Sequence, residues 1–161
     1  MNTIILAAGQ LNHRLLPMGA HQSNATIPVN GKPVIAWILD DLIAKGVSAL
    51  IIVVRADNQR LSELLRLCYD HKLQITILEI EQSESIVHSL KTGLEQADNS
   101  MPSRVILGDT LIRDDFQHVS GDFIYTARVN VSDIWCVAEV DTNGAVKAYR
   151  DKQSIPGDSF D

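Results

Sequence analysis

Short apolar runs alternate along the first two thirds of the chain with stretches in which apolar residues recur every three or four positions. The runs lack polar alternation and are rich in β-branched residues, which is typical of strands buried on both faces of a sheet. The predicted strands cover residues 3–6, 49–54, 75–80 and 104–107.

The periodic stretches between these strands predict amphipathic helices. One begins at Pro33, where the missing N–H of proline is not needed, and Gly46 is a plausible end for it. Two more cover residues 61–68 and 86–94, the latter with Ser83 or Ser85 as its N-cap. Residues 9–31 show no periodicity and predict a long loop.

This alternation of strands and helices predicts an α/β fold, with a mostly parallel sheet covered by helices on both faces. The length of 161 residues suggests a single domain over residues 1–161.

The alternation of predicted strands and helices stops after Asp109. Residues 122–129, 134–140 and 145–149 predict strands of a mixed or antiparallel kind. Asp141-Thr142-Asn143-Gly144 predicts a hairpin turn, because Asn-Gly supplies the positive φ angles that such turns need. Residues 154–161 are polar and close no element, so we expect a domain that is incomplete at its C-terminus.

Two predicted strand ends carry chemistry. Ala7-Ala8-Gly9 follows the first strand and Gly108-Asp109 follows the fourth. Ligands of parallel α/β sheets bind beyond the carboxyl ends of the strands, so both ends would face one crevice if both strands are central. Small residues let backbone N–H groups approach an anion. Asp109 is either a ligand of Mg²⁺ or a residue that caps a turn.

Cations in the first loop are candidates for binding phosphate. Arg14 has the planar fork that suits phosphate oxygens, with a solvated loop arginine as the alternative. His13 and His21 are weaker candidates, and Lys32 could be structural. A Walker A motif is absent, because no Gly-Lys-Ser/Thr follows at the right spacing. G-x-G-x-x-G is absent because Gly9 is followed by Gln10 and Leu11.

The net charge and the hydropathy of the chain indicate which partners and which compartment to expect. A net charge of -6 argues against nucleic acid and against an anionic membrane surface as partners. No run approaches the roughly 20 apolar residues of a membrane span, and the apolar start is too short for a signal peptide, so we expect a cytoplasmic protein.

Cys68 and Cys136 have no C-x-x-C neighbour and predict two buried free thiols.

Three segments together resemble the nucleotidylyltransferases that make nucleotide sugars. They are residues 4–9 (IILAAG), Arg14-Leu15 with Pro17, and residues 27–35 (IPVNGKPVI). Gly108-Asp109 is similar to the strand-end aspartate motif of that family, and residues 82–90 fall where its members read base and ribose. Residues 141–152 resemble the strand-turn-strand that leads to a lysine segment.

The resemblance implies a three-layer, Rossmann-like fold of the GT-A kind and a reaction between a nucleoside triphosphate and a sugar or alcohol phosphate. That reaction releases pyrophosphate and uses Mg²⁺. By position, the resemblance implies catalytic roles for Arg14, Asp109 and Lys152, with Asp109 on the metal and Lys152 at the sugar phosphate. It implies nucleotide binding by Ala7, Ala8, Gly9, Arg14, Asn24, Ser85 and Gly108.

Departures from the family pattern keep several interpretations open. Leu11 replaces a glycine, Arg14 lies one residue late with His13 in its usual place, and Ser23-Asn24 replaces a Pro-Lys pair. The family's second metal-binding aspartate would lie later than residue 161. The chain is therefore an active, divergent transferase, a related nucleotide-binding or regulatory module without catalysis, or an unrelated flavodoxin-like or Rossmann domain. The base, the sugar and a homo-oligomeric state stay open.

Overall fold

The computed structural model describes residues 1–9, 22–113, 119, 121–130 and 132–153. The chain divides into two compact units, Met1–Arg113 and Asp114–Asp161. The expected single domain over residues 1–161 stays a prediction.

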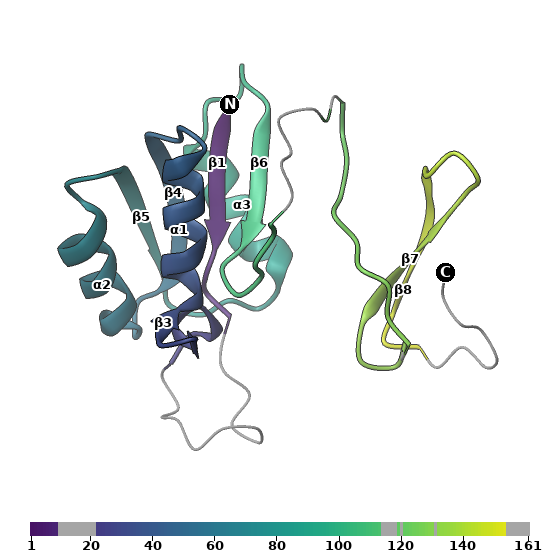
Figure 1. Cartoon of the computed structure of the whole chain (residues 1–161), viewed down its shortest axis with the longest axis horizontal. Helices are drawn as coiled ribbons and strands as arrows, with labels where there is room; N and C mark the ends of the chain where they lie inside the picture. The colour runs from purple at the N-terminus through teal and green to yellow at the C-terminus, as the bar shows by residue number, and fades with distance from the viewer. Residues whose placement is uncertain (10–21, 114–118, 120, 131, 154–161) are drawn as a thin grey trace. The chain divides into compact units, whose positions relative to one another are not determined.

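The first unit is built on a parallel sheet of four strands (Figure 1). The strands are β1 (Asn2–Leu6), β4 (Ala49–Arg55), β5 (Gln74–Ile80) and β6 (Ser103–Leu107), in the spatial order β5-β4-β1-β6. All four predicted strands are confirmed. In the described sheet β6 lies at the edge and not at the centre, but it pairs with β1 in register up to Leu6 and Leu107. The two chemistry-bearing strand ends are therefore adjacent.

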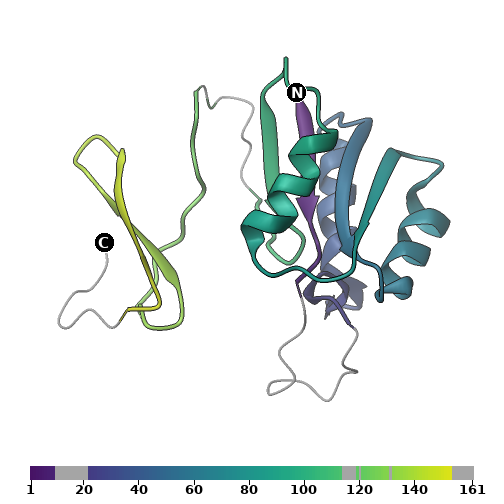
Figure 2. The same ribbon diagram turned by 180° about the vertical axis from the view of Figure 1, so that it is seen from behind.

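Helices cover both faces of this sheet, as predicted. Helices α1 (Val34–Ala44) and α2 (Gln59–Tyr69) lie on one face, and α3 (Ile86–Gln96) lies on the other (Figures 1 and 2). Successive residues of a strand point to opposite faces, so β1 contributes to both cores. Ile5 belongs to the α1 and α2 side, whereas Ile4 and Leu6 belong to the α3 side.

The ends of the helices follow the expected signals. Ser85, one of the two candidate caps, accepts a hydrogen bond from the backbone N–H of His88 at 3.2 Å. Asn58 caps α2 in the same way, through the N–H of Leu61. Gly46 has a φ of +80° just after α1, a conformation that favours glycine at a helix end.

A short ribbon of chain leads into α1. It contains the 3-10 helix η1 (Asn24–Thr26) and the two-residue strands β2 (Pro28–Val29) and β3 (Lys32–Pro33), which pair antiparallel. The loop predicted over 9–31 thus contains short regular elements after residue 22, while residues 10–21 lie outside the described part.

Lys32 has a structural role. Its ammonium group forms an ion pair with Asp40 and lies 4.2 Å from the centre of the Trp37 ring. The Tyr69 hydroxyl donates to Asp40 Oδ1 at 3.1 Å. Partial burial acts to raise the pKa of Asp40, but these bonds from Lys32 and Tyr69 outweigh it and hold the pKa below its usual value. The group therefore fastens the ribbon to α1 while Asp40 is ionised.

The second unit contains an antiparallel hairpin of β7 (Cys136–Val140) and β8 (Val146–Asp151). The strand predicted over residues 122–129 is wrong, because the structure has no strand among these residues. The apolar run there was misleading: Phe123 and Tyr125 are exposed, and their rings contact each other edge to face instead of packing in a sheet.

The predicted hairpin turn is present, but its chemistry differs from the expectation. Only Gly144 has a positive φ, and Asn143 does not. Asp141 organises the turn instead, because its Oδ1 accepts the N–H groups of Asn143 at 2.8 Å and of Ala145 at 2.9 Å. An irregular register at Glu139/Val140 accompanies this arrangement.

The cysteines correct another expectation. Cys68 and Cys136 are both free, but they are exposed and not buried. The buried stripe of α2 runs through Leu61, Leu65 and Tyr69, which leaves Cys68 off it. Within the described part of the chain, no helix is both long and apolar enough to cross a membrane.

Gly93 lets α3 approach the sheet closely. A Cβ at this position would lie 2.6 Å from Cγ2 of Ile4 and 3.4 Å from Cγ2 of Val53. We predict that Gly93→Ala lowers the free energy of unfolding by about 1–3 kcal/mol because of overpacking, although alanine is the better helix former. Urea unfolding measures this, with Gln96→Ala on the exposed side of α3 as the control. An unchanged or higher stability of Gly93→Ala would contradict the close packing.

Candidate functional site

The carboxyl ends of β1 and β6 approach each other closely. The N–H of Gly108 donates to the carbonyl of Leu6 at 2.8 Å. A Cβ on Gly108 would lie 2.9 Å from Cβ of Ala7 and 3.1 Å from Cα of Ala7. Because no real side chain fits there without displacing Ala7, the approach requires glycine at position 108.

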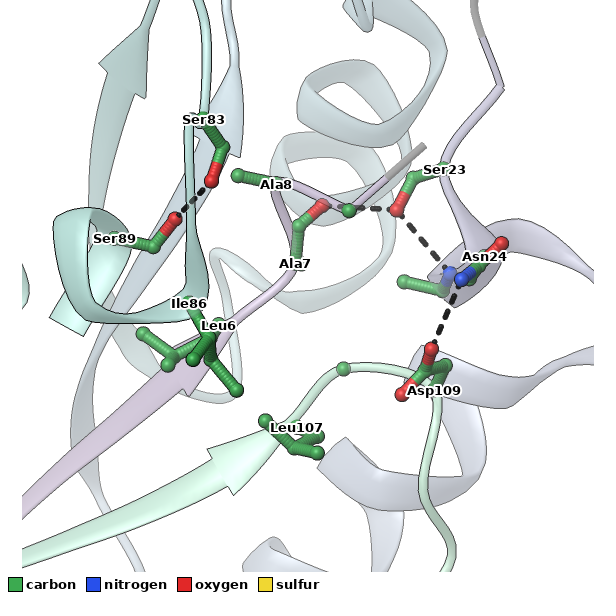
Figure 3. Close-up of a pocket in the computed structure, with 13 residues that line it drawn as sticks. Leu6, Ala7, Ala8, Ser23, Asn24, Ser83, Ile86, Ser89, Leu107 and Asp109 are labelled. Atoms are coloured by element: carbon green, nitrogen blue, oxygen red, sulfur yellow. Dashed lines mark hydrogen bonds between the residues drawn. The ribbon is translucent and has the colours of Figure 1, made fainter. Parts of the chain in front are cut away.

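A pocket of about 200 Å³ opens at this edge of the sheet (Figure 3). Four segments of the first unit contribute to it: the ends of β1 and β6, the turn at η1 and the start of α3. Its lining residues are Leu6, Ala7, Ala8, Gly9, Ser23, Asn24, Ala25, Ser83, Ile86, Ser89, Leu107, Gly108 and Asp109.

Ser23 fastens the returning chain to the end of β1. Its side chain is buried, donates to the carbonyl of Ala7 at 2.8 Å and accepts the N–H of Ala25 at 3.2 Å. The Thr26 hydroxyl donates to the carbonyl of Ser23 at 2.7 Å. These bonds place the next residue, Asn24, beside β6.

Asn24 and Asp109 form a direct pair although they lie 85 positions apart in the sequence. Asn24 Nδ2 donates to Asp109 Oδ2 at 3.0 Å, as Figure 3 shows. The hydroxyl of Thr110 donates to Asp109 Oδ1 at 3.3 Å. Among the lining residues that the structure describes, Asp109 is the one charged side chain.

Two serine hydroxyls mark the α3 side of the pocket. Ser83 Oγ and Ser89 Oγ are 2.8 Å apart, and Ser89 is buried. Ser83 Oγ also donates to the carbonyl of Ser85 at 3.1 Å, so Ser89 supplies the hydrogen between the two hydroxyls. Ile86 lies next to them as an exposed apolar side chain that lines the pocket. This side therefore combines an apolar surface with hydroxyl oxygens that accept hydrogen bonds.

Most of the residues predicted for the site meet in this pocket. It is lined by Ala7, Ala8, Gly9, Asn24, Gly108 and Asp109. The structure says different things about the other three predicted residues. Ser85 caps α3 and is not part of the lining. Lys152 belongs to the second unit, where its N–H donates to the carbonyl of Trp135 at 2.9 Å. Arg14 lies outside the described residues.

Sequence reasoning gave Ser23 no role at the site, and it included Ile86 and Ser89 only within residues 82–90, the segment that resembles the base- and ribose-reading part of the family. Serines are common in loops and caps, so no signal marked Ser23 as a buried anchor. Ser89 could have been found from its spacing, because it follows Ile86 by three positions on a helix that starts at a strand end.

A divalent cation would have few protein ligands here. Among the described residues, no group of three or more His, Cys, Asp or Glu side chains could hold a metal ion. The donor set at the pocket is one carboxylate, Asp109, beside an amide and a hydroxyl. Such a set fits Mg²⁺, which keeps several waters and commonly uses one or two carboxylates together with phosphate oxygens.

Comparison with protein families identifies the chain. Residues 2–155 match the family model described as nucleotidyl transferase. The chain belongs to this family. The match includes the pocket and the hairpin of the second unit, so it confirms the resemblance drawn from the motifs.

Individual relatives are distant. A glucose-1-phosphate thymidylyltransferase of Mycolicibacterium smegmatis is 27% identical over 97% of this chain and 57% of its own length. A UTP–glucose-1-phosphate uridylyltransferase of Haloferax volcanii is 27% identical over 90% of this chain and 57% of its own length. The bifunctional protein GlmU of Cupriavidus pinatubonensis is 30% identical over 68% of this chain and 22% of its length. The chain thus spans little more than half the length of the first and the second, and much less of the third.

Solved structures support the fold. A crystal structure described as a putative glucose-1-phosphate thymidylyltransferase from Bacillus anthracis, in complex with a sucrose, has a TM-score of 0.81. The match covers 98% of this chain and 67% of the chain in that structure, at 19% sequence identity. A UDP-glucose pyrophosphorylase complexed with UDP-glucose has a TM-score of 0.57, at 21% identity over 67% of this chain and 45% of its own. The three-layer, Rossmann-like fold is confirmed.

Replacing Ser23 tests how the pocket is assembled. Ser23→Ala removes the donor to Ala7 and the acceptor for Ala25 from a buried position, and we expect it to lower the free energy of unfolding by about 1–3 kcal/mol. Urea unfolding measures the change, with the exposed Ser48→Ala as the matched control. Equal stabilities of the two variants would show that Ser23 does not anchor the loop.

Proposed function

We propose that this protein transfers the nucleotidyl group of a nucleoside triphosphate to a sugar phosphate. The carrying observation is that Ala7-Ala8-Gly9 and Asp109, which come from two strands distant in sequence, line one pocket. Family membership supports the same chemistry. The thymidylyl- and uridylyltransferases among the relatives make dTTP or UTP with glucose 1-phosphate the first pairs to test.

The proposed reaction exchanges one phosphorus–oxygen bond for another. A phosphate oxygen of the sugar phosphate attacks the α-phosphorus of the triphosphate, and the bond from the α-phosphorus to the oxygen shared with the β-phosphorus breaks. The products are the nucleotide sugar and pyrophosphate. Catalysis of this kind depends mainly on the positioning of the reactants and on stabilisation of charge.

The described residues provide positioning. Ala7, Ala8, Gly9 and Gly108 have little or no side chain, so a ligand can approach the strand ends closely. Leu6, Ile86 and Leu107 give the pocket apolar surface suited to a nucleoside.

Asp109 would hold Mg²⁺, with the Asn24 amide fixing one of its carboxylate oxygens. When bound, Mg²⁺ supplies positive charge at the phosphate oxygens as the bond to pyrophosphate breaks. In this proposal Arg14 contacts the phosphates, Lys152 the sugar phosphate and Ser85 the nucleotide. In this proposal the enzyme is a cytoplasmic, single-domain protein that can form a homo-oligomer.

A second candidate function is nucleotide binding without transfer. It is favoured by one observation: the described lining contains an amide, Asn24, beside the carboxylate, and no cationic side chain. A regulatory or binding module would need the pocket but not the charge stabilisation that transfer requires.

Pyrophosphate release separates these two functions. We expect the protein with MgCl₂ to release pyrophosphate with at least one pair from a panel of nucleoside triphosphates and sugar phosphates, including dTTP and UTP with glucose 1-phosphate. Nucleotide binding without release for any pair would contradict transfer and favour the binding module.

The role of Asp109 can be tested by removing its charge. Asp109→Asn keeps the shape of the side chain, and we expect Mg²⁺-dependent pyrophosphate release to fall about a hundredfold or more. Glu95→Gln, which removes the same charge from an exposed position on α3, is the control and should retain activity. If both variants are equally active, Asp109 is a turn residue and not a metal ligand.

A further inference from the structure

The charge of the pocket depends on the partner of Asp109. A carboxylate paired with a lysine or arginine is largely neutralised, and its pair carries no net charge. Asp109 instead accepts from two neutral groups, the Asn24 amide at 3.0 Å and the Thr110 hydroxyl at 3.3 Å. These bonds orient the carboxylate, and neither partner brings a positive charge.

The surroundings do not offset this charge within the described lining. Its polar side chains are serines, Asn24 and Asp109, and none of them is cationic. Asp109 is exposed, so a hydrated cation can reach it directly from solvent. A free polyphosphate that approaches this carboxylate meets a charge of the same sign, whereas a polyphosphate complexed with a divalent cation brings the opposite charge.

We infer that Asn24 couples nucleotide binding to a divalent cation: the pocket favours the cation–nucleotide complex over the free nucleotide. Asn24 is then a specificity-determining residue, which selects the charge state of the ligand. It acts by holding Asp109 in position without neutralising it. This inference rests on the proposed function, because it assumes that the ligand carries phosphates.

The geometry gives the amide this selective effect. Figure 3 shows the Asn24 side chain reaching from η1 towards Asp109 at the end of β6. A cationic side chain placed at position 24 would therefore lie beside the same carboxylate and could contact both it and a phosphate. The coupling to the metal would then weaken, because part of the positive charge would come from the protein.

The experiment measures the dissociation constants of UTP and of dTTP by calorimetry, in MgCl₂ and in EDTA. For the unmodified protein we expect binding in EDTA to be weaker by about a hundredfold or more for the nucleotide that binds in MgCl₂. Asn24→Lys should strengthen binding in EDTA and reduce this ratio by about tenfold or more. Asn24→Arg is a second variant with the same expectation, and the urea midpoint of each variant establishes that it is folded.

The matched control is Asn99→Lys. Asn99 is exposed and precedes the start of β6, whereas the pocket lies at the carboxyl end of that strand. This variant therefore makes the same change in net charge away from Asp109. Its metal dependence should equal that of the unmodified protein. An equal fall of the ratio in Asn99→Lys would mean that net charge, and not position 24, sets the dependence, and would overturn the inference.

Two further outcomes separate this inference from the proposed function. Binding that is equally tight in MgCl₂ and in EDTA overturns the coupling but leaves nucleotide binding intact. Absence of binding of any nucleoside triphosphate in MgCl₂ overturns the proposed function and the inference together.

Discussion

The close approach of two strand ends is the constraint on which the site depends. Gly108 donates to the carbonyl of Leu6 at 2.8 Å, and the space beside Ala7 has no room for a Cβ. This contact extends the register of β1 and β6 one residue past the sheet and brings Asp109 next to the small residues after β1. A wider separation would move the carboxylate away from the surface that a ligand would contact.

Contacts from the chain that leads into α1 also stabilise the carboxyl ends of β1 and β6. Ser23 ties η1 to Ala7, and Asn24 ties it to Asp109, so the returning chain bridges β1 and β6. The group of Lys32, Asp40 and Tyr69 then fastens the ribbon to α1 and α2. Hydrogen bonds to backbone and side-chain atoms thus connect the pocket, through the ribbon, to α1 and α2.

The sequence predicted the parts of this structure that depend on local patterns. Buried strands of continuous apolar residues, the helix starting at Pro33 and the turn at Gly46 all follow from periodicity and backbone preference. It failed where an apolar run has no strand to pair with, as at Phe123 and Tyr125, and where a helix turns a residue off its buried stripe, as at Cys68. The Asn24–Asp109 pair and the anchor at Ser23 join distant positions, and no local pattern encodes such contacts.

Gly93 has a consequence for the α3 side of the pocket. Because α3 approaches Ile4 of β1 without an intervening side chain, any bulk added at Gly93 would push the helix away from the sheet. Ser89 lies one turn before Gly93 on the same helix, so this contact helps to place it at the pocket. Asp109 lies on an exposed turn, where the bonds from Asn24 and Thr110 orient its carboxylate. A substitution in the core beside Gly93 would therefore be felt at the α3 side of the pocket, whereas the Asp109 side depends on the bond from Asn24.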